Sequence, residues 1–345
     1  MPLVIFTFYL TFISLINANN FSSRFIDLAM IQNIFIFILM VNHARKDQLA
    51  LEKGMLSMAL GAILVSLLMT FGIGVTLMAE DAFGLINRVT FFNAELNEIG
   101  LKLVAGIVII LASFFNNPLK LNKMVILIGL FCVPLMLNSI IGTASRTAVL
   151  TLLLCGLSWI FFRTLASNKK FLTLILTTFI LVTILVPAIF IISQIETFEL
   201  LASRLESTGG AGDNSPTGRI SLWLGFFSLI FTNIFFGNGY SGFDLITYEY
   251  FGFIESPHNV FLEVMLYTGI IGLVFYSMFL YRILKAAYHL YSKHNLLLPI
   301  LIAPIAFAFI FILQGLNEKV CWILMAYVTG TFIYFEKNKL KTIRK

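Results

Sequence analysis

The sequence predicts an all-α polytopic membrane protein, and three observations lead to that fold class. Hydrophobic residues make up 59% of the 345 positions and charged residues only 12%, which is about half the charged share of soluble domains. The apolar residues occur in long unbroken runs, not in the alternating pattern of a transmembrane β-barrel. Basic residues gather in alternate connections between the runs. We therefore expect a bundle of about ten spanning helices.

The apolar runs define the expected spans. They lie at 3–17, 25–42, 54–79, 99–115, 124–141, 148–162, 171–193, 259–281, 296–314 and 320–335. The first run is not followed by a small-residue cleavage site, so we expect a retained helix there. Because no repeat or low-complexity tract divides the chain, we expect one membrane domain over residues 1–345.

The basic residues predict the orientation of the bundle. Most of the 23 lysines and arginines lie in four of the connections and in the C-terminal tail. Cytoplasmic loops are enriched in these residues, so these connections and both termini are predicted to be cytoplasmic. Three of the four histidines, His43, His289 and His294, fall in the cytoplasmic connections. Since topology accounts for the net charge of +6, no nucleic-acid partner is expected.

The segment 222–236 tests this topology, because it is apolar enough to resemble another span. A crossing there would move the basic tail to the outer face, and the run is short for a bilayer. We therefore expect a surface helix inside a long outer loop at 194–258. Pro216 is expected in its first turn, and Gly237 and Gly239 are expected to end it.

Three arginines on the predicted outer side are the first candidates for chemistry. Arg146 stands between two spans with almost no loop, Arg219 begins the loop helix, and Arg88 lies in a shorter outer loop. A helix N-terminus with a guanidinium binds anions, and arginine grips phosphate oxygens in a bidentate fork. Each arginine alone could equally anchor the chain at the membrane surface or pair with a nearby carboxylate. Together they favour an anionic ligand.

His258 is the histidine on the predicted outer side, immediately before a span. Histidine is suited to acid–base work near neutral pH, although a helix-capping role is the simpler alternative. Four carboxylates are possible partners: Asp244, Glu249, Glu255 and Glu263. Neither an Asp-x-Asp pair nor a P-loop is present, and the three cysteines lack metal-ligand spacing. We therefore expect no metal and no cofactor, and a cytoplasmic nucleotide-sugar donor is disfavoured.

Four segments, in their order and spacing, resemble the bacterial superfamily of O-antigen ligases and O-antigen polymerases. The segments are Arg88–Gly100, Ser145–Thr147, Gly218–Trp223 leading into Phe236–Phe243, and Pro257–Glu263 followed by Thr268–Gly272. The resemblance extends along most of the chain. Each motif is loose by itself, and their place relative to the spans makes the set more specific.

The resemblance implies a GT-C-like membrane enzyme of the bacterial cell inner membrane with its active site facing the periplasm. It would perform a metal-independent, inverting glycosyl transfer from a glycan on undecaprenyl pyrophosphate, whose lipid tail lies among the spans. Arg146 and Arg219 match arginines that hold the pyrophosphate, and His258 matches a histidine that activates or positions the acceptor hydroxyl. The residues assigned to substrate binding are Arg88, Asn97, Glu255, Asn259 and Glu263.

The residue patterns at Gly237–Phe243 and Pro257–Glu263 resemble those of polymerases more closely than those of ligases. A polymerase joins one lipid-linked glycan to another repeat unit. A ligase, which moves finished polymer to lipid A-core, is the first alternative, because it must bind the same pyrophosphate. A flippase or exporter of lipid-linked oligosaccharides is the second, although transporters more often carry mid-membrane charges and repeated halves. A chain-length regulator protein is a candidate partner.

Overall fold

Helices dominate the described residues in the computed structural model of the chain. It describes residues 2–16, 28–44, 46–78, 88–92, 94–116, 122–166, 171–172, 175, 216–240, 243–252, 256–312 and 316–343. The helices are α1 (Pro2–Ile16), α2 (Leu28–Ala44), α3 (Gln48–Thr70), α4 (Leu96–Asn116), α5 (Lys123–Gly142), α6 (Arg146–Ala166), α9 (Pro216–Thr232), α10 (Phe243–Phe251), α11 (Val260–His294), α12 (Leu298–Ile312) and α13 (Lys319–Ile343). Strands β1 (Val75–Met78) and β2 (Arg88–Phe91) form a two-stranded antiparallel ribbon.

The chain divides into two compact units. The first comprises Met1–Leu39, Gly209–Ala286 and Phe309–Ala326, and the second comprises Met40–Thr208, Ala287–Ala308 and Tyr327–Lys345. Several long helices contribute residues to both: α11 gives 260–286 to the first unit and 287–294 to the second.

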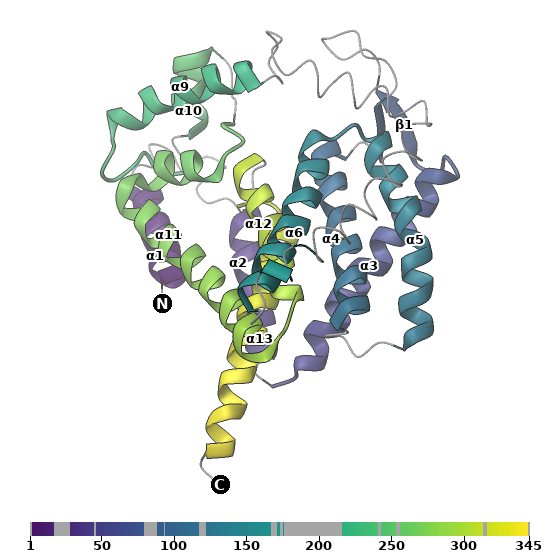
Figure 1. The fold of residues 1–345 in the computed structure, drawn as a ribbon. Coiled ribbons are helices and arrows are strands. Elements are labelled where there is room, and N and C mark those ends of the chain that lie inside the picture. The colour runs from purple at the N-terminus through teal and green to yellow at the C-terminus, as the bar shows by residue number, and fades with distance from the viewer. Residues whose placement is uncertain are drawn as a thin grey trace. The chain divides into compact units, whose positions relative to one another are not determined.

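The second unit is organised around α4, which packs against α3, α5 and α6 (Figure 1). Nearly three quarters of its apolar stretch is buried, far more than in the neighbouring helices. The start of α5 is fixed by Asn122, whose side chain accepts a hydrogen bond from the backbone N–H of Met124. The outward faces of the helices around α4 are apolar instead of polar, with Phe131 on α5 75% exposed. Such a surface suits lipid and not water.

The first unit is held together by aromatic side chains. Phe6 of α1 packs on Tyr276 of α11 with ring centroids 5.4 Å apart, and Phe279 stacks on Trp322 of α13 at 6.2 Å. Phe226 of α9 packs on Phe251 of α10 at 5.1 Å. These ring pairs contribute apolar contacts between α1 and α11, between α11 and α13, and between α9 and α10 within this unit.

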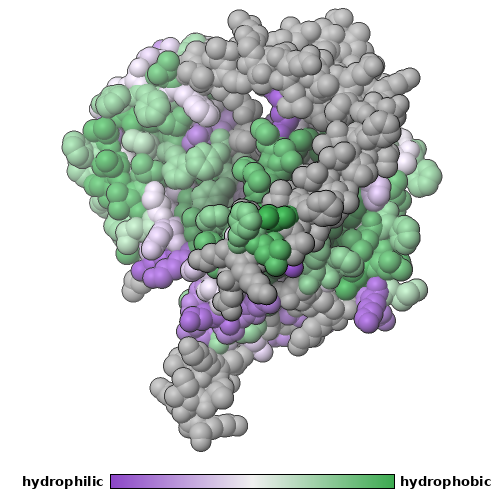
Figure 2. Space-filling model, viewed as in Figure 1, coloured by the Kyte–Doolittle hydropathy of each residue, from purple (hydrophilic) through white to green (hydrophobic). Residues whose placement is uncertain are grey.

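Among the described residues, five helices are long and apolar enough to cross a membrane. They are Ala50–Thr70, Leu96–Phe115, Lys123–Gly142, Arg146–Leu165 and Val260–His294. Shorter apolar helices occur at Pro2–Ile16, Met30–Ala44, Leu222–Thr232 and Leu298–Phe311. Figure 2 shows apolar side chains over much of the described surface that faces the viewer, as expected for a protein that sits in a bilayer. The chain thus has the features of an all-α, multi-pass membrane protein, whereas ten spans and their orientation remain predictions.

Three predicted boundaries were wrong. The run at 54–79 ends as a helix at Thr70, and Val75–Met78 is a strand because two residues with positive φ, Gly72 and Gly74, turn the chain back. The predicted span at 259–281 belongs to a helix that continues to His294, so His289 and His294 lie on α11 and not in a connection. The loop helix begins at Pro216 as predicted, but it ends at Thr232, before Gly237. Most of the expected span at 171–193 lies outside the described residues.

Candidate functional site

The first group of predicted site residues lies at the start of α6, in the second unit. Ala144 has a φ of 49°, which is uncommon for a residue with a side chain. Ser145 follows as the N-cap: its hydroxyl accepts from the backbone N–H of Ala148 at 3.3 Å. Arg146 is then the first residue of the helix and is half-buried. The guanidinium is therefore attached at the positive end of the α6 dipole, where an anion is favoured.

Asn97 is tied to this helix start. The Ser145 hydroxyl donates to Asn97 Oδ1 at 2.8 Å, while the Asn97 amide lies 3.4 Å from a Glu95 carboxylate oxygen. The two segments come this close because of Gly100, one turn along α4. A Cβ there would lie 2.7 Å from the Cβ of Ala148, so any side chain would push the helices apart. The structure thus brings Asn97 to the N-cap that directly precedes Arg146.

Arg88 is the first residue of β2, where it pairs with Met78 of β1. The ribbon leads through Phe91 into α4, and β2 packs against the start of that helix. Arg88 thus lies in the same unit as Asn97 and Arg146, and its predicted role remains a proposal.

The second group lies at the start of α11, in the first unit, and is built in the same way. His258 has a φ of 46°, and Asn259 follows as the N-cap. The Asn259 side chain accepts from the backbone N–H groups of Phe261 at 3.0 Å and Leu262 at 3.4 Å. The left-handed conformation of His258 thus changes the chain direction at the start of α11, and its imidazole lies immediately before the N-cap residue.

Glu263, in the first turn of α11, is hydrogen-bonded to the segment that precedes the helix. Its carboxylate is 4% exposed and accepts a hydrogen bond from the Ser256 hydroxyl at 3.1 Å. The same hydroxyl accepts from the backbone N–H of His258 at 3.2 Å. Ser256 therefore links the side chain of Glu263 to the backbone of His258, and these two hydrogen bonds stabilise the strained turn.

Trp223 connects the loop helix to the same turn. Its indole N–H donates to the carbonyl of Pro257 at 2.8 Å, one residue before His258. Arg219 lies on α9 four residues before Trp223, one helical turn away. The segments that carry Arg219 and His258 are therefore in direct contact through Trp223 and Pro257, although they lie far apart in the sequence.

A second contact joins the end of α9 to α11, where the helix is broken at Gly269 (φ 61°). The backbone N–H of Ile270 donates to Ile234 at 2.8 Å, and the N–H groups of Asn238 and Gly239 donate to Leu266 and Tyr267 at 2.8 and 2.9 Å. A Cβ on Gly269 would lie 2.3 Å from the carbonyl oxygen of Phe235. Irregular backbone is tolerated in a membrane helix where other protein groups satisfy it, as they do here.

The predicted site residues therefore form two groups, one in each compact unit. Arg88, Asn97 and Arg146 belong to one, and Arg219, His258, Asn259 and Glu263 belong to the other. Glu255 lies outside the described residues. Sequence reasoning assigned no role to Ser256, and it treated Trp223 and Ser145 only as parts of motifs. Of these, Ser145 carried a readable signal, because a serine directly before an apolar run is typical of an N-cap.

At these two helix starts, no trio of described His, Cys, Asp or Glu residues has the spacing of metal ligands. The groups that the structure offers a substrate there are a guanidinium at a helix N-terminus, an imidazole, a buried carboxylate and amides. Arginine and a helix N-terminus suit an anion, and imidazole suits proton transfer to or from a hydroxyl.

Comparison with known proteins agrees with this chemistry. Residues 130–277 match the protein family described as O-antigen ligase. The matched stretch includes Arg146, Arg219 and the turn from Ser256 to Glu263, whereas Arg88 and Asn97 precede it. No curated protein matches the chain. Residues 130–277 thus form an O-antigen ligase family domain, which confirms the predicted resemblance to the superfamily of O-antigen ligases and polymerases.

Proposed function

We propose that the protein is a surface-polysaccharide polymerase. It transfers a glycan from undecaprenyl pyrophosphate to a lipid-linked repeat unit at the periplasmic face of the bacterial inner membrane. The family match supports a membrane enzyme of the O-antigen ligase and polymerase type in polysaccharide biosynthesis. The single observation that carries the proposal is the start of α6, where Arg146 is the first residue of a helix capped by Ser145.

The reaction requires a group that stabilises the departing pyrophosphate. The acceptor hydroxyl oxygen attacks the anomeric carbon of the donor sugar, a new C–O bond forms, and the bond to pyrophosphate breaks with its electron pair. Negative charge therefore grows on the phosphate oxygens. Arg146 and the N–H groups at the start of α6 are suited to stabilise that charge, and the family resemblance assigns the same role to Arg219. Arg88 contacts the donor phosphate or glycan.

The acceptor hydroxyl must lose its proton in the same step, and His258 takes or orients that proton. Glu263 is less suited to act as the base, because it is buried and accepts the Ser256 hydrogen bond. It holds the turn on which His258 stands. Asn259 and Glu255 contact the glycan next to this turn. The transfer uses neither metal nor cofactor.

A ligase is the second candidate, favoured by the description of the matching family. The two are separated by deleting the gene in the source bacterium and analysing its surface polysaccharide on gels. Core carrying a single repeat unit indicates a polymerase. Core without O-antigen, together with accumulated lipid-linked polymer, indicates a ligase. Unchanged polysaccharide with intermediates held at the cytoplasmic face would contradict both and favour an exporter.

A further inference from the structure

A cluster of metal-ligating side chains lies far along α11 from His258, at the end of that helix. His289 and His294 of α11 and Glu336 of α13 each offer one ligand atom, and these atoms lie within 4.8 Å of one another. All three residues belong to the second unit. None of them has a place in the proposed transfer reaction.

The backbone fixes His294 at this position. Asn295 has a φ of 53° and ends α11, with its N–H bonded to the carbonyl of Tyr291 at 2.9 Å. The N–H of Leu296 turns back to the carbonyl of Leu290 at 3.3 Å. This left-handed C-terminal cap holds the last helical residue in place and leaves its side chain as part of the helix surface.

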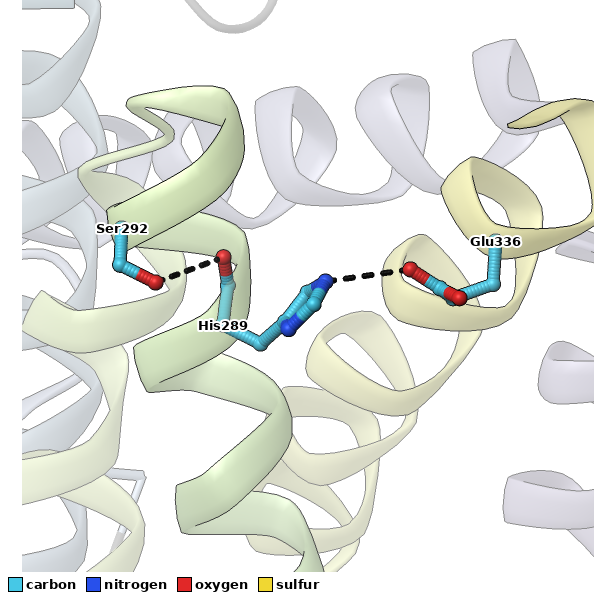
Figure 3. A network of polar contacts seen from close by, with 3 residues as sticks. All are labelled: His289, Ser292 and Glu336. Carbon is cyan, nitrogen blue, oxygen red and sulfur yellow. Dashed lines mark hydrogen bonds and ion pairs between the residues drawn. The ribbon is translucent and has the colours of Figure 1, made fainter.

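Two phenylalanines of α13 orient the imidazoles. The ring of His294 packs on Phe335 with centroids 4.5 Å apart, and the ring of His289 meets the edge of Phe332 at 5.4 Å. Figure 3 shows His289 pointing from α11 toward Glu336 on α13, with Nε2 and Oε1 3.1 Å apart. Packing of this kind, from groups that are not themselves ligands, is how proteins preorganise metal ligands.

We propose that His289, His294 and Glu336 bind a divalent transition-metal ion, with Zn²⁺ the best fit, and that the ion fastens the end of α11 to α13. Two imidazoles and one carboxylate are a common ligand set for zinc. Tetrahedral bonds of about 2.0–2.1 Å place ligand atoms about 3.3 Å apart. The His289–Glu336 pair already meets that spacing, and His294 reaches it by a small side-chain movement.

The surroundings set the expected strength of binding. The side chains of His289 and Glu336 are 34% and 38% exposed, so water is available as the fourth ligand. Lys293 and Lys337 adjoin the cluster in sequence and weaken its attraction for a cation. We therefore expect a dissociation constant of about one micromolar, weaker than that of closed structural zinc sites.

The test is titration of ZnCl₂ into the purified full-length protein in detergent, after removal of metal with a chelator. We expect one Zn²⁺ per chain and a rise in the thermal unfolding temperature. His294→Ala and Glu336→Gln should each weaken binding by about tenfold or more. The matched control is His43→Ala, which removes an exposed imidazole at the end of α2, outside the cluster.

His294→Ala is the sharpest variant, because it leaves the His289–Glu336 pair intact. If that pair is only an ion pair, the wild type will bind no zinc, and the proposal is overturned. Equal zinc affinity in wild type and His294→Ala, or an equal loss in His43→Ala, also overturns it. Should His294→Ala fail to fold, His294→Gln replaces it. Visible absorption of bound Co²⁺ gives an independent measure of four-coordinate binding.

Discussion

The starts of α6 and α11 are built on one plan and carry different chemistry. In each, a residue with positive φ precedes an N-cap, and the cap side chain accepts backbone N–H groups of the first turn. At α6 the left-handed residue is Ala144, and the cation follows the cap as Arg146. At α11 the left-handed residue is His258 itself, and a buried carboxylate, Glu263, follows inside the helix.

The difference supports a division of labour between the two helix starts, as part of the proposed function. A cation on the first helical residue adds to the dipole of α6, so that end of the helix is suited to hold an anion. At α11 the first turn holds the buried carboxyl group of Glu263 in place of a cation, so that end of the helix is less suited to phosphate. An imidazole on a strained turn, held by Ser256 and Trp223, is suited to a neutral hydroxyl. Four sets of variants test this comparison.

Arg146→Ala should have the largest effect. Loss of the charge at the start of α6 should lower the transfer rate by about a thousandfold, since stabilisation of the leaving pyrophosphate is lost. Arg146→Lys should restore part of the rate only, because a point charge does not replace a bidentate fork. Chain-length distributions on gels and transfer rates in vitro measure both.

Arg163→Ala is the matched control. It removes an exposed arginine at the opposite end of α6, where the guanidinium lies over Trp159. Normal long chains are expected. If Arg163→Ala is as damaging as Arg146→Ala, the special place of Arg146 is refuted.

His258→Asn should come next, with a loss of about a hundredfold in transfer rate. Asparagine tolerates the left-handed conformation, so the variant removes the imidazole without adding backbone strain. His258→Gly would relax the strain as well. Both variants should unfold at nearly the wild-type temperature. A fully active His258→Asn enzyme would leave the histidine with a structural role alone.

Loss of the hydrogen bond between Ser256 and Glu263 should have a smaller effect on the transfer rate. Ser256→Ala and Glu263→Gln should each lower the rate by about tenfold, the equivalent of one hydrogen bond to a charged group. Because both act through one bond, the double variant should be no worse than the more damaging single one. Additive losses in this cycle would show that Ser256 and Glu263 act separately.

Ser145→Ala should have the smallest effect. It removes the cap of α6 and the bond to Asn97, at a cost of about 1 kcal/mol in stability. Ser145→Asp keeps a capping oxygen and, by its negative charge beside Arg146, should weaken donor binding without unfolding the protein. Thermal unfolding in detergent and donor affinity separate the two outcomes. An equal thermal loss in both variants would argue against the cap.

The sequence predicted what local chemistry determines. Hydropathy is a sum over neighbouring residues, so the cores of most described helices appear as apolar runs. The motif containing Arg146 also stood out, because arginine is expensive beside a bilayer. The start of α9 at Pro216 followed from the fixed φ of proline.

Other features depend on segments far apart in the sequence and were therefore hidden. The bond from Ser145 to Asn97 and the contact of His289 with Glu336 each join two different helices. The break at Gly269 is stable only because the segment after α9 supplies partners for its backbone groups. Glycine in a predicted span indicates a possible break, but it does not identify those partners.

The most direct test of the division of labour is the affinity of purified protein for undecaprenyl pyrophosphate, compared with undecaprenyl phosphate. Wild type should prefer the pyrophosphate, and Arg146→Ala should lose that preference with a drop in affinity of about tenfold or more. His258→Asn should bind the pyrophosphate as wild type does, although its transfer rate is low. If His258→Asn loses as much donor affinity as Arg146→Ala, the two helix starts do not divide the work, and the account is contradicted.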